Sequence, residues 1–371
     1  MVRLANPVDF WRGVALVFIF VNHIPGIYYS RFTHFHYSLS DSADLFVFLA
    51  GWALRLLVGT QERRQSTWYL VLRLAGRAVT IYAAQILITM IALAMLAAGA
   101  ILLNNPLLLE WHNAAAVFHD PVATHVGLAL ITHQLGYFDI LPLYVVLMLI
   151  AAPIIAVVDR FAPWAVLPLS LLVYAVTLAL QISIPTWPVE GQWFFNPLAW
   201  QLVFVLGFVM AREDGVGGFV RRHIVAIRWI AAPIVMAALV CVLTGWWWDP
   251  TKVPPPRLFF LIDKAFETPP RLIQFLALIA VMSATYPYIL KASRGLVNFL
   301  SMLGRNSLYV FCVASILSLG GQIIRYIYQG NFVIDTAVVV CGVAIMALTA
   351  WLPEWREDVR GRRSVATAQP S

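Results

Sequence analysis

The chain has few charged residues, and this shortage excludes a broad class of proteins. Asp, Glu, Lys and Arg make up 12% of the 371 residues, against about a quarter in a typical soluble domain. Hydrophobic residues make up 61%, and the mean hydropathy is +0.81. The composition therefore excludes an ordinary soluble domain and predicts an all-α, polytopic integral membrane protein.

Cysteine is also scarce, and the three present offer no obvious chemistry. They lie in separate apolar segments, at Cys241, Cys312 and Cys341, without CxxC or Cys/His spacing. We expect small buried hydrophobic residues there rather than redox or zinc groups. The histidines form no HExxH-like motif, so we expect no metal site and no permanently bound cofactor. No small-residue cleavage site accompanies the first apolar run, which we expect to be retained.

Long apolar runs dominate the chain and predict about ten transmembrane helices. Their expected spans are residues 13–29, 44–60, 78–103, 138–158, 163–182, 196–211, 229–246, 271–290, 306–328 and 332–352. Residues 295–303 are too few to span, and we expect a surface helix there. We therefore expect one transmembrane domain over residues 1–353 and a polar cytoplasmic tail over residues 354–371.

Basic residues set the expected orientation in the membrane. With the N-terminus in the cytoplasm, 19 of the 25 Lys and Arg residues fall on the inner side and six on the outer side. This positive-inside bias places both termini in the cytoplasm, which agrees with an even number of spans. The net charge of +7 then reflects topology and lipid headgroups, and we expect no nucleic-acid partner.

The first apolar run carries ionisable residues at membrane depth. Arg12 and His23 are separated by about 20° around an α-helix and by about 16 Å along its axis. Asp9 lies on the same side, three residues before Arg12. Because ionisable groups at that depth are costly, they usually mark a functional interior.

Two acidic residues enter the predicted helices from the outer side. Asp44 begins the second span and Asp139 the fourth, and from there either could reach the His23 imidazole. A carboxylate that accepts from one ring nitrogen fixes the tautomer and makes the other nitrogen more basic. The alternative is a structural polar cluster that fixes helix packing. Because Arg12 is in register with His23, we favour the functional interpretation.

Arginines on the inner side are candidates for phosphate binding. Arg73 and Arg77 follow the second span, and Arg305 and Asn306 precede or begin the ninth. Guanidinium groups bind polyphosphates through fixed bidentate donors. A helix start also presents unpaired N–H groups to an anion. Ordinary positive-inside anchoring is the alternative explanation for most of these arginines.

The outer loops are rich in aromatic residues. Trp187 and Trp193 lie in the loop before the sixth span. One interpretation is an interfacial aromatic belt, which tryptophan favours in any membrane protein. The other is a vestibule whose rings stack on an extracytoplasmic ligand such as a sugar, and the sequence leaves both open.

These residues also carry a family resemblance. Asp9-x-x-Arg12-Gly13 followed by His23 resembles the Arg-x10-His signature of membrane acyltransferase-3 proteins. The fuller pattern resembles the OpgC family of osmoregulated periplasmic glucan succinyltransferases. Its matching segments keep their order over most of the chain and are residues 9–19, 22–25, 40–51, 139–144, 196–201, 270–272 and 304–311.

The resemblance implies a ten-helix enzyme of the bacterial inner membrane. It would move an acyl group, succinyl by resemblance, from cytoplasmic acyl-CoA to a periplasmic glucan or another saccharide. Acyl-CoA would then be a co-substrate rather than a bound cofactor. Arg12, together with Arg73, Arg77 and Arg305, would hold the phosphate end of CoA.

The same resemblance implies roles for the buried polar residues. His23 would act as the general base for the acceptor hydroxyl, or form a covalent acyl-histidine. Asn22 or Gln201 would donate a hydrogen bond to the oxyanion. Asp44 or Asp139 would orient the imidazole.

Two other classes of function stay open. The first is a proton-coupled secondary transporter in which Asp9, Arg12, His23 and Asp139 form a relay, although the chain has no second copy of the first-helix pattern. The second is a structural or polymer-export partner without catalysis. The sequence also leaves open the acyl group, the acceptor and the oligomeric state, a homo-oligomer included.

Overall fold

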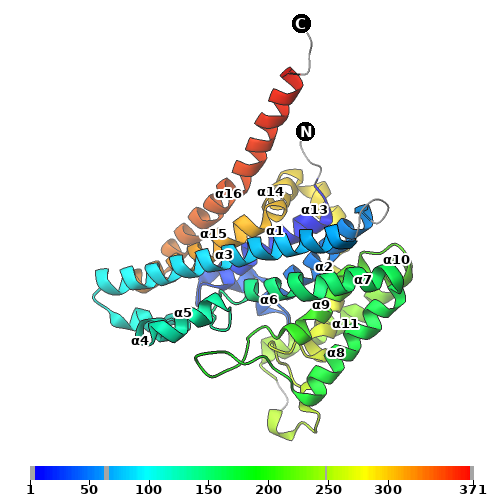
Figure 1. The fold of residues 1–371 in the computed structure, drawn as a ribbon, viewed down its shortest axis with the longest axis horizontal. Coiled ribbons are helices and arrows are strands. Elements are labelled where there is room, and N and C mark those ends of the chain that lie inside the picture. The colour runs from blue at the N-terminus through cyan, green and yellow to red at the C-terminus, as the bar shows by residue number, and fades with distance from the viewer. Residues whose placement is uncertain (1–4, 62–66, 247–248, 368–371) are drawn as a thin grey trace. The chain divides into compact units, whose positions relative to one another are not determined.

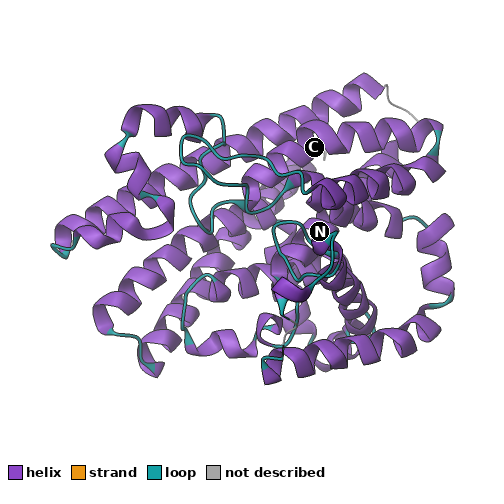
Figure 2. Ribbon diagram, turned by 90° about the horizontal axis from the view of Figure 1, so that it is seen from below, coloured by secondary structure: helices purple, strands orange, loops and turns teal. Residues whose placement is uncertain are grey.

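The computed structural model describes residues 5–61, 67–246 and 249–367, and these residues are almost entirely helical (Figure 1). The only extended pairing within these ranges is an isolated antiparallel bridge between Pro185 and Gln192. Figure 2 shows helices joined by loops, with no strand among the described residues. The predicted all-α fold class is therefore confirmed.

In the described residues, sixteen α-helices and seven short 3-10 or π segments follow one another in sequence. The α-helices are α1 (Pro7–Asn22), α2 (Ser42–Gln61), α3 (Thr67–Leu102), α4 (Ala115–His119), α5 (Pro121–Ala129), α6 (Ile140–Val146), α7 (Ala152–Phe161), α8 (Val166–Leu180), α9 (Pro197–Met210), α10 (Gly215–Arg222), α11 (Ile224–Thr244), α12 (Pro269–Met282), α13 (Tyr286–Ala292), α14 (Arg294–Arg305), α15 (Ser307–Tyr328) and α16 (Phe332–Thr367). The short segments are η1 (Tyr28–Phe32), η2 (His34–His36), η3 (Pro106–Asn113), η4 (Leu147–Ala151), η5 (Pro163–Ala165), η6 (Pro250–Lys252) and η7 (Arg257–Phe259).

Helices lie at all ten positions where the apolar runs predict membrane spans, but their lengths differ. Within the described ranges, seven helices are long and apolar enough to cross a membrane, or eight if α12 and α13 count as one span. The other two, α1 and α9, have 16 and 14 residues, or about 24 and 21 Å against a hydrocarbon core of about 30 Å. The membrane character is supported, and the count of ten stays a prediction.

The first helix begins and ends earlier than its expected span of residues 13–29. Asn6 caps α1 by accepting from the Asp9 backbone N–H, and Pro7 occupies the first turn. The helix ends at Asn22 because Pro25 follows and Gly26 has a φ of +74°. His23 is therefore the residue that ends the helix.

The chain divides into two compact units. The first comprises Met1–Thr33 and Ala284–Ser371, and the second comprises His34–Ser283. The first unit therefore combines α1 with α13 to α16 from the other end of the chain. Residues 354–367 of the expected polar tail continue α16, and residues 368–371 lie outside the described residues.

A close crossing of α1 and α14 organises the first unit. A Cβ atom on Gly13 would overlap the Leu300 carbonyl, and one on Gly304 would overlap the Asp9 carbonyl. Only glycine lets the two backbones touch at both points. The amphipathic α14, predicted over residues 295–303 as a surface helix, buries Val297 and Gly304 in this unit.

The second unit contains an equivalent crossing between α2 and α9. A Cβ atom on Gly51 would overlap the Phe204 carbonyl, and one on Gly207 would overlap the Phe48 carbonyl. The contact buries nearly all of α9, Trp200 included. Because this contact fixes the first turn of α2 against the first turn of α9, it places the polar residues that precede both helices.

Candidate functional site

His23 lies in the first unit, where α15 fixes the end of α1. The last carbonyl groups of a helix have no partner within the helix, and side chains of α15 supply donors here. The Ser318 hydroxyl donates to the Phe20 carbonyl at 2.9 Å, and the Gln322 amide donates to the His23 carbonyl at 2.5 Å. The His23 side chain itself is half-buried.

The turn that follows His23 is held by side chains of α15 and α16. The Arg325 guanidinium of α15 donates to the Pro25 carbonyl and lies 2.8 Å from the Asp335 carboxylate of α16. That carboxylate accepts from the Tyr28 backbone N–H at 2.7 Å. The backbone on both sides of His23 is thus anchored by side chains more than 290 residues later in the chain.

The other predicted residues of α1 have local partners. The Asn22 side-chain oxygen accepts from the Thr33 hydroxyl at 2.7 Å, one residue before the proposed base. Arg12 lies 3.8 Å from the Asp9 carboxylate, and both side chains are mostly buried. Their assignment to oxyanion and phosphate binding stays a prediction.

Arg305 and Asn306, predicted to bind phosphate, meet an acidic residue of α16 instead. The Arg305 guanidinium contacts both oxygens of Glu354, at 2.8 and 3.2 Å. The Asn306 amide also contacts Glu354, at 3.4 Å. This bidentate geometry is the one a phosphate would use, so an anion at Arg305 would have to displace Glu354.

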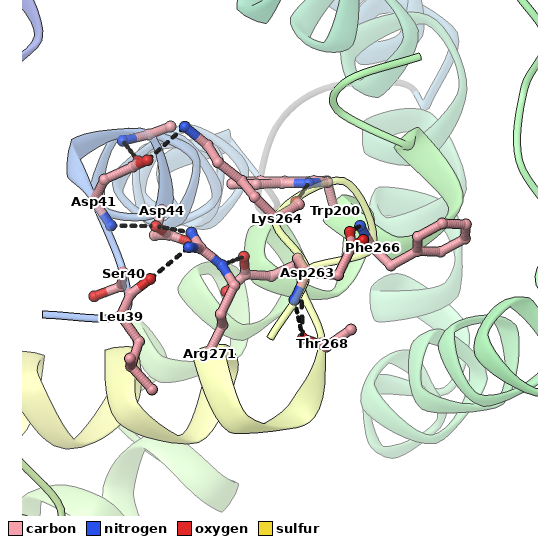
Figure 3. A network of polar contacts seen from close by, with 12 residues as sticks. Leu39, Ser40, Asp41, Asp44, Trp200, Asp263, Lys264, Phe266, Thr268 and Arg271 are labelled. Carbon is pink, nitrogen blue, oxygen red and sulfur yellow. Dashed lines mark hydrogen bonds and ion pairs between the residues drawn. The ribbon is translucent and has the colours of Figure 1, made fainter. Parts of the chain in front are cut away.

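A buried network of charged residues lies in the second unit (Figure 3). Arg271, near the start of α12, donates to Asp44 of α2 and to Glu267, each at 3.0 Å. It also donates to the Leu39 carbonyl. The Asp44 and Glu267 side chains are both 0% exposed. Asp44, predicted to orient His23, is therefore held by a guanidinium.

The network continues to Lys264 and Asp41. The two side chains form an ion pair, and the Lys264 ammonium lies 5.1 and 5.2 Å from the centres of the Phe194 and Phe195 rings. The Asp41 backbone N–H donates to Asp44 at 2.7 Å, which joins the two parts. Lys264 remains 30% exposed, so this end of the network is open.

A compact loop presents Lys264 and Glu267. The Asp263 carboxylate accepts from the Phe266 N–H, and the Thr268 hydroxyl accepts from the Asp263 N–H (Figure 3). The Trp200 indole donates to the Lys264 carbonyl at 3.0 Å. Glu267 has a φ of +44°, a left-handed conformation that is costly for glutamate. Such strain persists only where the surrounding bonds fix it.

Burial and the neighbouring charges of this network shift the pKa values of Asp41, Lys264 and Glu267, which lie outside the apolar helices. Burial raises the pKa of the Asp41 carboxyl, but the charges of Lys264 and Arg271 outweigh it and hold that pKa well below its usual range. Burial lowers the pKa of Lys264, but Asp41 outweighs it and raises the pKa. Burial, then the Asp44 charge, raises the pKa of Glu267 well above its usual range.

Asp139, the second carboxylate predicted to orient His23, precedes α6 in the same unit. Burial raises its pKa to about 6, against the lowering effect of Lys264. It therefore belongs electrostatically to the Lys264 end of the network. Its pairing with His23, like that of Asp44, stays a prediction.

Gln201 is engaged between two helices. Its amide nitrogen donates to the Ser170 carbonyl at 3.0 Å, and its oxygen accepts from the Ser170 hydroxyl at 2.6 Å. The same nitrogen lies 3.3 Å from the Leu198 carbonyl. An oxyanion would have to compete with these bonds between α8 and α9.

The remaining predicted residues differ in exposure. Arg73 and Arg77 lie one turn apart on α3, and both are exposed. Trp187 is 47% exposed, whereas Trp193 is 4% exposed. Trp187 alone therefore presents a broad ring surface to a ligand or lipid. In the described part of the chain, no three His, Cys, Asp or Glu side chains form a metal-binding group.

Sequence reasoning missed Lys264, Glu267 and Gln322. A signal existed for the first two, because both precede an apolar helix that carries Arg271 near its start. Charged residues at such a boundary are usually assigned to the water interface. For Gln322 the sequence offers one signal, which is that Ser318, Gln322 and Arg325 lie on one face of a helix. That face can be interpreted only when the structure shows it in contact with the end of α1.

Comparison with known proteins gives a result at the family level. A family model described as OpgC protein matches residues 3–358. The match spans nearly the whole chain and includes segments of both units. A search of the curated proteins found no match.

Proposed function

We propose that this chain, which belongs to the OpgC protein family, is a membrane acyltransferase acting on a glucan. The acyl group is expected to be succinyl, the donor cytoplasmic acyl-CoA and the acceptor a hydroxyl of a periplasmic glucan. The family match over residues 3–358 carries the proposal. The long apolar helices support a place in a membrane, which we take to be the bacterial inner membrane. We further propose a relationship to the acyltransferase-3 proteins.

The donor end of the proposed reaction needs cations for the CoA phosphates. Arg73 and Arg77 are exposed one turn apart on α3, a spacing that suits a diphosphate. Arg12 lies near the start of α1, eleven residues before His23. From Arg12 the long pantetheine arm of CoA would then run along α1 toward the half-buried His23 imidazole.

Chemistry at the thioester requires one base. The acceptor hydroxyl loses its proton to the neutral His23 imidazole while its oxygen attacks the thioester carbonyl carbon. The tetrahedral oxyanion collapses, the C–S bond breaks, and the imidazolium returns the proton to the CoA sulfur. An ester and free CoA thiol result, with no net gain or loss of protons. The anchored backbone around His23 supports this role, because a general base must be held in position.

Product analysis in cells tests the proposal directly. Periplasmic glucans are isolated from cells with and without the protein, and their masses are compared. We expect an added mass of one succinyl group per modified hydroxyl only where the protein is present. Another acyl mass would correct the donor, and unmodified glucans would overturn the proposal.

The first prediction concerns the proposed base. His23→Ala is expected to abolish acylation, with a loss of at least about a hundredfold, because a positioned general base typically contributes about 10²–10⁴-fold. Purified protein in lipid vesicles is assayed for CoA thiol release from succinyl-CoA in the presence of glucan. His119→Ala is the matched control, because that side chain is 77% exposed on an outer loop. Normal turnover by His23→Ala would remove His23 from the chemistry.

The vesicle assay also separates the proposal from transport. An acyltransferase releases CoA thiol in proportion to the ester formed. A secondary transporter would move the glucan or an anion across the vesicle membrane without consuming acyl-CoA. Uptake without thiol release would therefore favour the transporter.

A further inference from the structure

Two buried carboxyl groups share one guanidinium in the second unit. Arg271 donates from its Nη2 atom to Asp44 Oδ2 (Figure 3), at 3.0 Å. Its Nε atom donates to Glu267 Oε2, also at 3.0 Å. Both carboxyl groups are 0% exposed. One cation therefore faces two acidic groups from which water is excluded.

The second oxygen of each carboxyl group has no donor. Asp44 Oδ1 and Glu267 Oε1 are fully buried and lack a hydrogen-bond partner among the described residues. The charge of Asp44 acts on Glu267 across this site, and it raises the pKa of the Glu267 carboxyl group. Two ionised carboxylates are acceptors only, so neither can supply the missing donor to the other, whereas a proton on one of them can.

The charges around the pair also indicate that one proton is bound. Lys264 and Asp41 neutralise each other at one end of the network, and Arg271 neutralises one of the remaining two carboxylates. A further ionised carboxylate would leave an uncompensated buried negative charge, which is strongly unfavourable. A single proton makes this group of five side chains electrically neutral.

The other polar groups near Glu267 do not supply that compensation. The Tyr174 hydroxyl donates to the Glu267 backbone carbonyl at 2.7 Å rather than to its carboxyl group. Asp139 interacts with Lys264 and Asp41 at the far end of the network and is itself acidic. The cations that act on the group are Lys264 and Arg271 at Asp41 and Arg271 at Glu267.

We propose that Asp44 and Glu267 form a buried binding site for one proton, which Glu267 carries and Arg271 holds in place. The proton links α2 to the loop before α12 through a carboxyl–carboxylate hydrogen bond. This inference goes beyond the proposed function, because it holds for this network whatever reaction the protein catalyses.

The proton site gives stability a defined pH dependence. Burial and the Asp44 charge raise the pKa of Glu267 in the folded protein, whereas an unfolded glutamate has a pKa of about 4.3. The folded state therefore binds a proton that the unfolded state has released. Stability is highest below the unfolded pKa and falls as the pH rises through the folded pKa.

Glu267→Gln isolates this effect because its amide stays neutral at every pH. The amide can still donate to Asp44 and accept from Arg271. Glu213→Gln is the matched control, because Glu213 is exposed and lies outside the network. The melting temperatures of the full-length wild type and both variants are measured in detergent from about pH 5 to about pH 9.

We expect the wild type and Glu213→Gln to lose at least about 3 °C more than Glu267→Gln over this range. Infrared spectra with and without ¹³C-labelled glutamate provide the second measurement. The wild type should show the carbonyl band of a protonated glutamate that shifts with the label, and Glu267→Gln should lack it.

Parallel melting curves, or a protonated-glutamate band that survives in Glu267→Gln, would overturn the proposal. A wild type without the band, whose melting temperature at high pH rises with Na⁺, would instead identify a cation site and also overturn it. If Glu267→Gln does not insert, the isotope-shifted band of the wild type decides the matter. Loss of acyltransferase activity has no bearing on these measurements, so the two proposals fail independently.

Discussion

At the scale of single residues, a charged side chain that already has an internal partner can bind a ligand only by giving up that partner. Arg305 illustrates this, because its Nε and Nη2 atoms both donate to Glu354 in the bidentate geometry of a bound phosphate. Arg73 and Arg77 differ, because both are exposed on α3. A phosphate could therefore approach the arginines of α3 directly. At Arg305 it would have to compete with the Glu354 carboxylate.

This competition predicts that removing the Glu354 charge strengthens CoA binding. Glu354→Gln is expected to lower the Kd for CoA about two- to fivefold, because a partly exposed ion pair contributes about 1 kcal/mol at most. Calorimetric titration with CoA measures the change. Glu357→Gln removes the same charge one turn later on α16 and is expected to leave Kd within about twofold. Unchanged binding by Glu354→Gln would exclude Arg305 from the phosphate site.

Gln322 gives a second prediction at the residue scale. Gln322→Met removes the donor to the His23 carbonyl at similar length, so kcat is expected to fall about tenfold with KM changed less than about twofold. Gln322→Glu donates only when protonated and should recover activity toward low pH. Ser315→Ala is the control, because that hydroxyl bonds only to its own helix, at Phe311. A change in KM alone would contradict a positioning role for Gln322.

At the scale of elements, both units are built around a helix pair whose backbones touch. Reciprocal glycines produce the contact in each case, Gly13 with Gly304 and Gly51 with Gly207. In lipid, apolar side chains gain little from leaving their solvent, so close packing of small residues contributes most of the association energy. The residues that flank these crossings are thereby held in fixed positions.

The α2–α9 crossing predicts a large difference between two glycines of one helix. Gly51→Ala forces a Cβ atom into the Phe204 carbonyl and is expected to destabilise the protein by about 1–3 kcal/mol. Gly59→Ala meets no atom within 4 Å and should be neutral or stabilising by up to about 1 kcal/mol. Thermal unfolding in detergent compares them, and equal melting temperatures would contradict the proposed close contact.

At the scale of the whole molecule, the two units divide the predicted chemistry between them. The unit with His23 joins the first 33 residues to the last quarter of the chain, and the unit with Asp44 and Asp139 lies between them in sequence. The long-range contacts within the first unit form only once α15 and α16 are present, because those helices carry the partners of α1 and of the turn after it. Membrane topology governs that assembly, because every helix must enter with a defined orientation.

The orientation itself is the prediction at this scale. Glu190 and Glu213 are both exposed in the second unit, and the basic residues place them on opposite sides of the membrane. In a chain whose three native cysteines are replaced, Glu190→Cys should react with an impermeant thiol reagent added to the periplasmic side. Glu213→Cys should react only after the membrane is permeabilised. The reverse pattern would invert the topology.

The sequence was most informative about helices and least informative about partners. Apolar runs place the helices correctly because a backbone in lipid must satisfy its own hydrogen bonds, and a helix does so locally. The end of α1 was harder to predict, since apolar residues continue beyond Asn22 and it is the turn at Pro25 and Gly26 that stops the helix. The resemblance to the OpgC family was confirmed because its segments are spread through both units.

By itself, then, the sequence determined the helical class, the helix positions and the family, which all follow from local composition and ordered motifs. Only the tertiary structure decided that Arg271 holds Asp44, because those residues are 227 positions apart. It likewise decided that Arg305 pairs with Glu354 and that the Gln322 amide donates to the His23 carbonyl. A partner for a buried charge is selected by helix packing, and no local pattern of residues encodes which helices will meet.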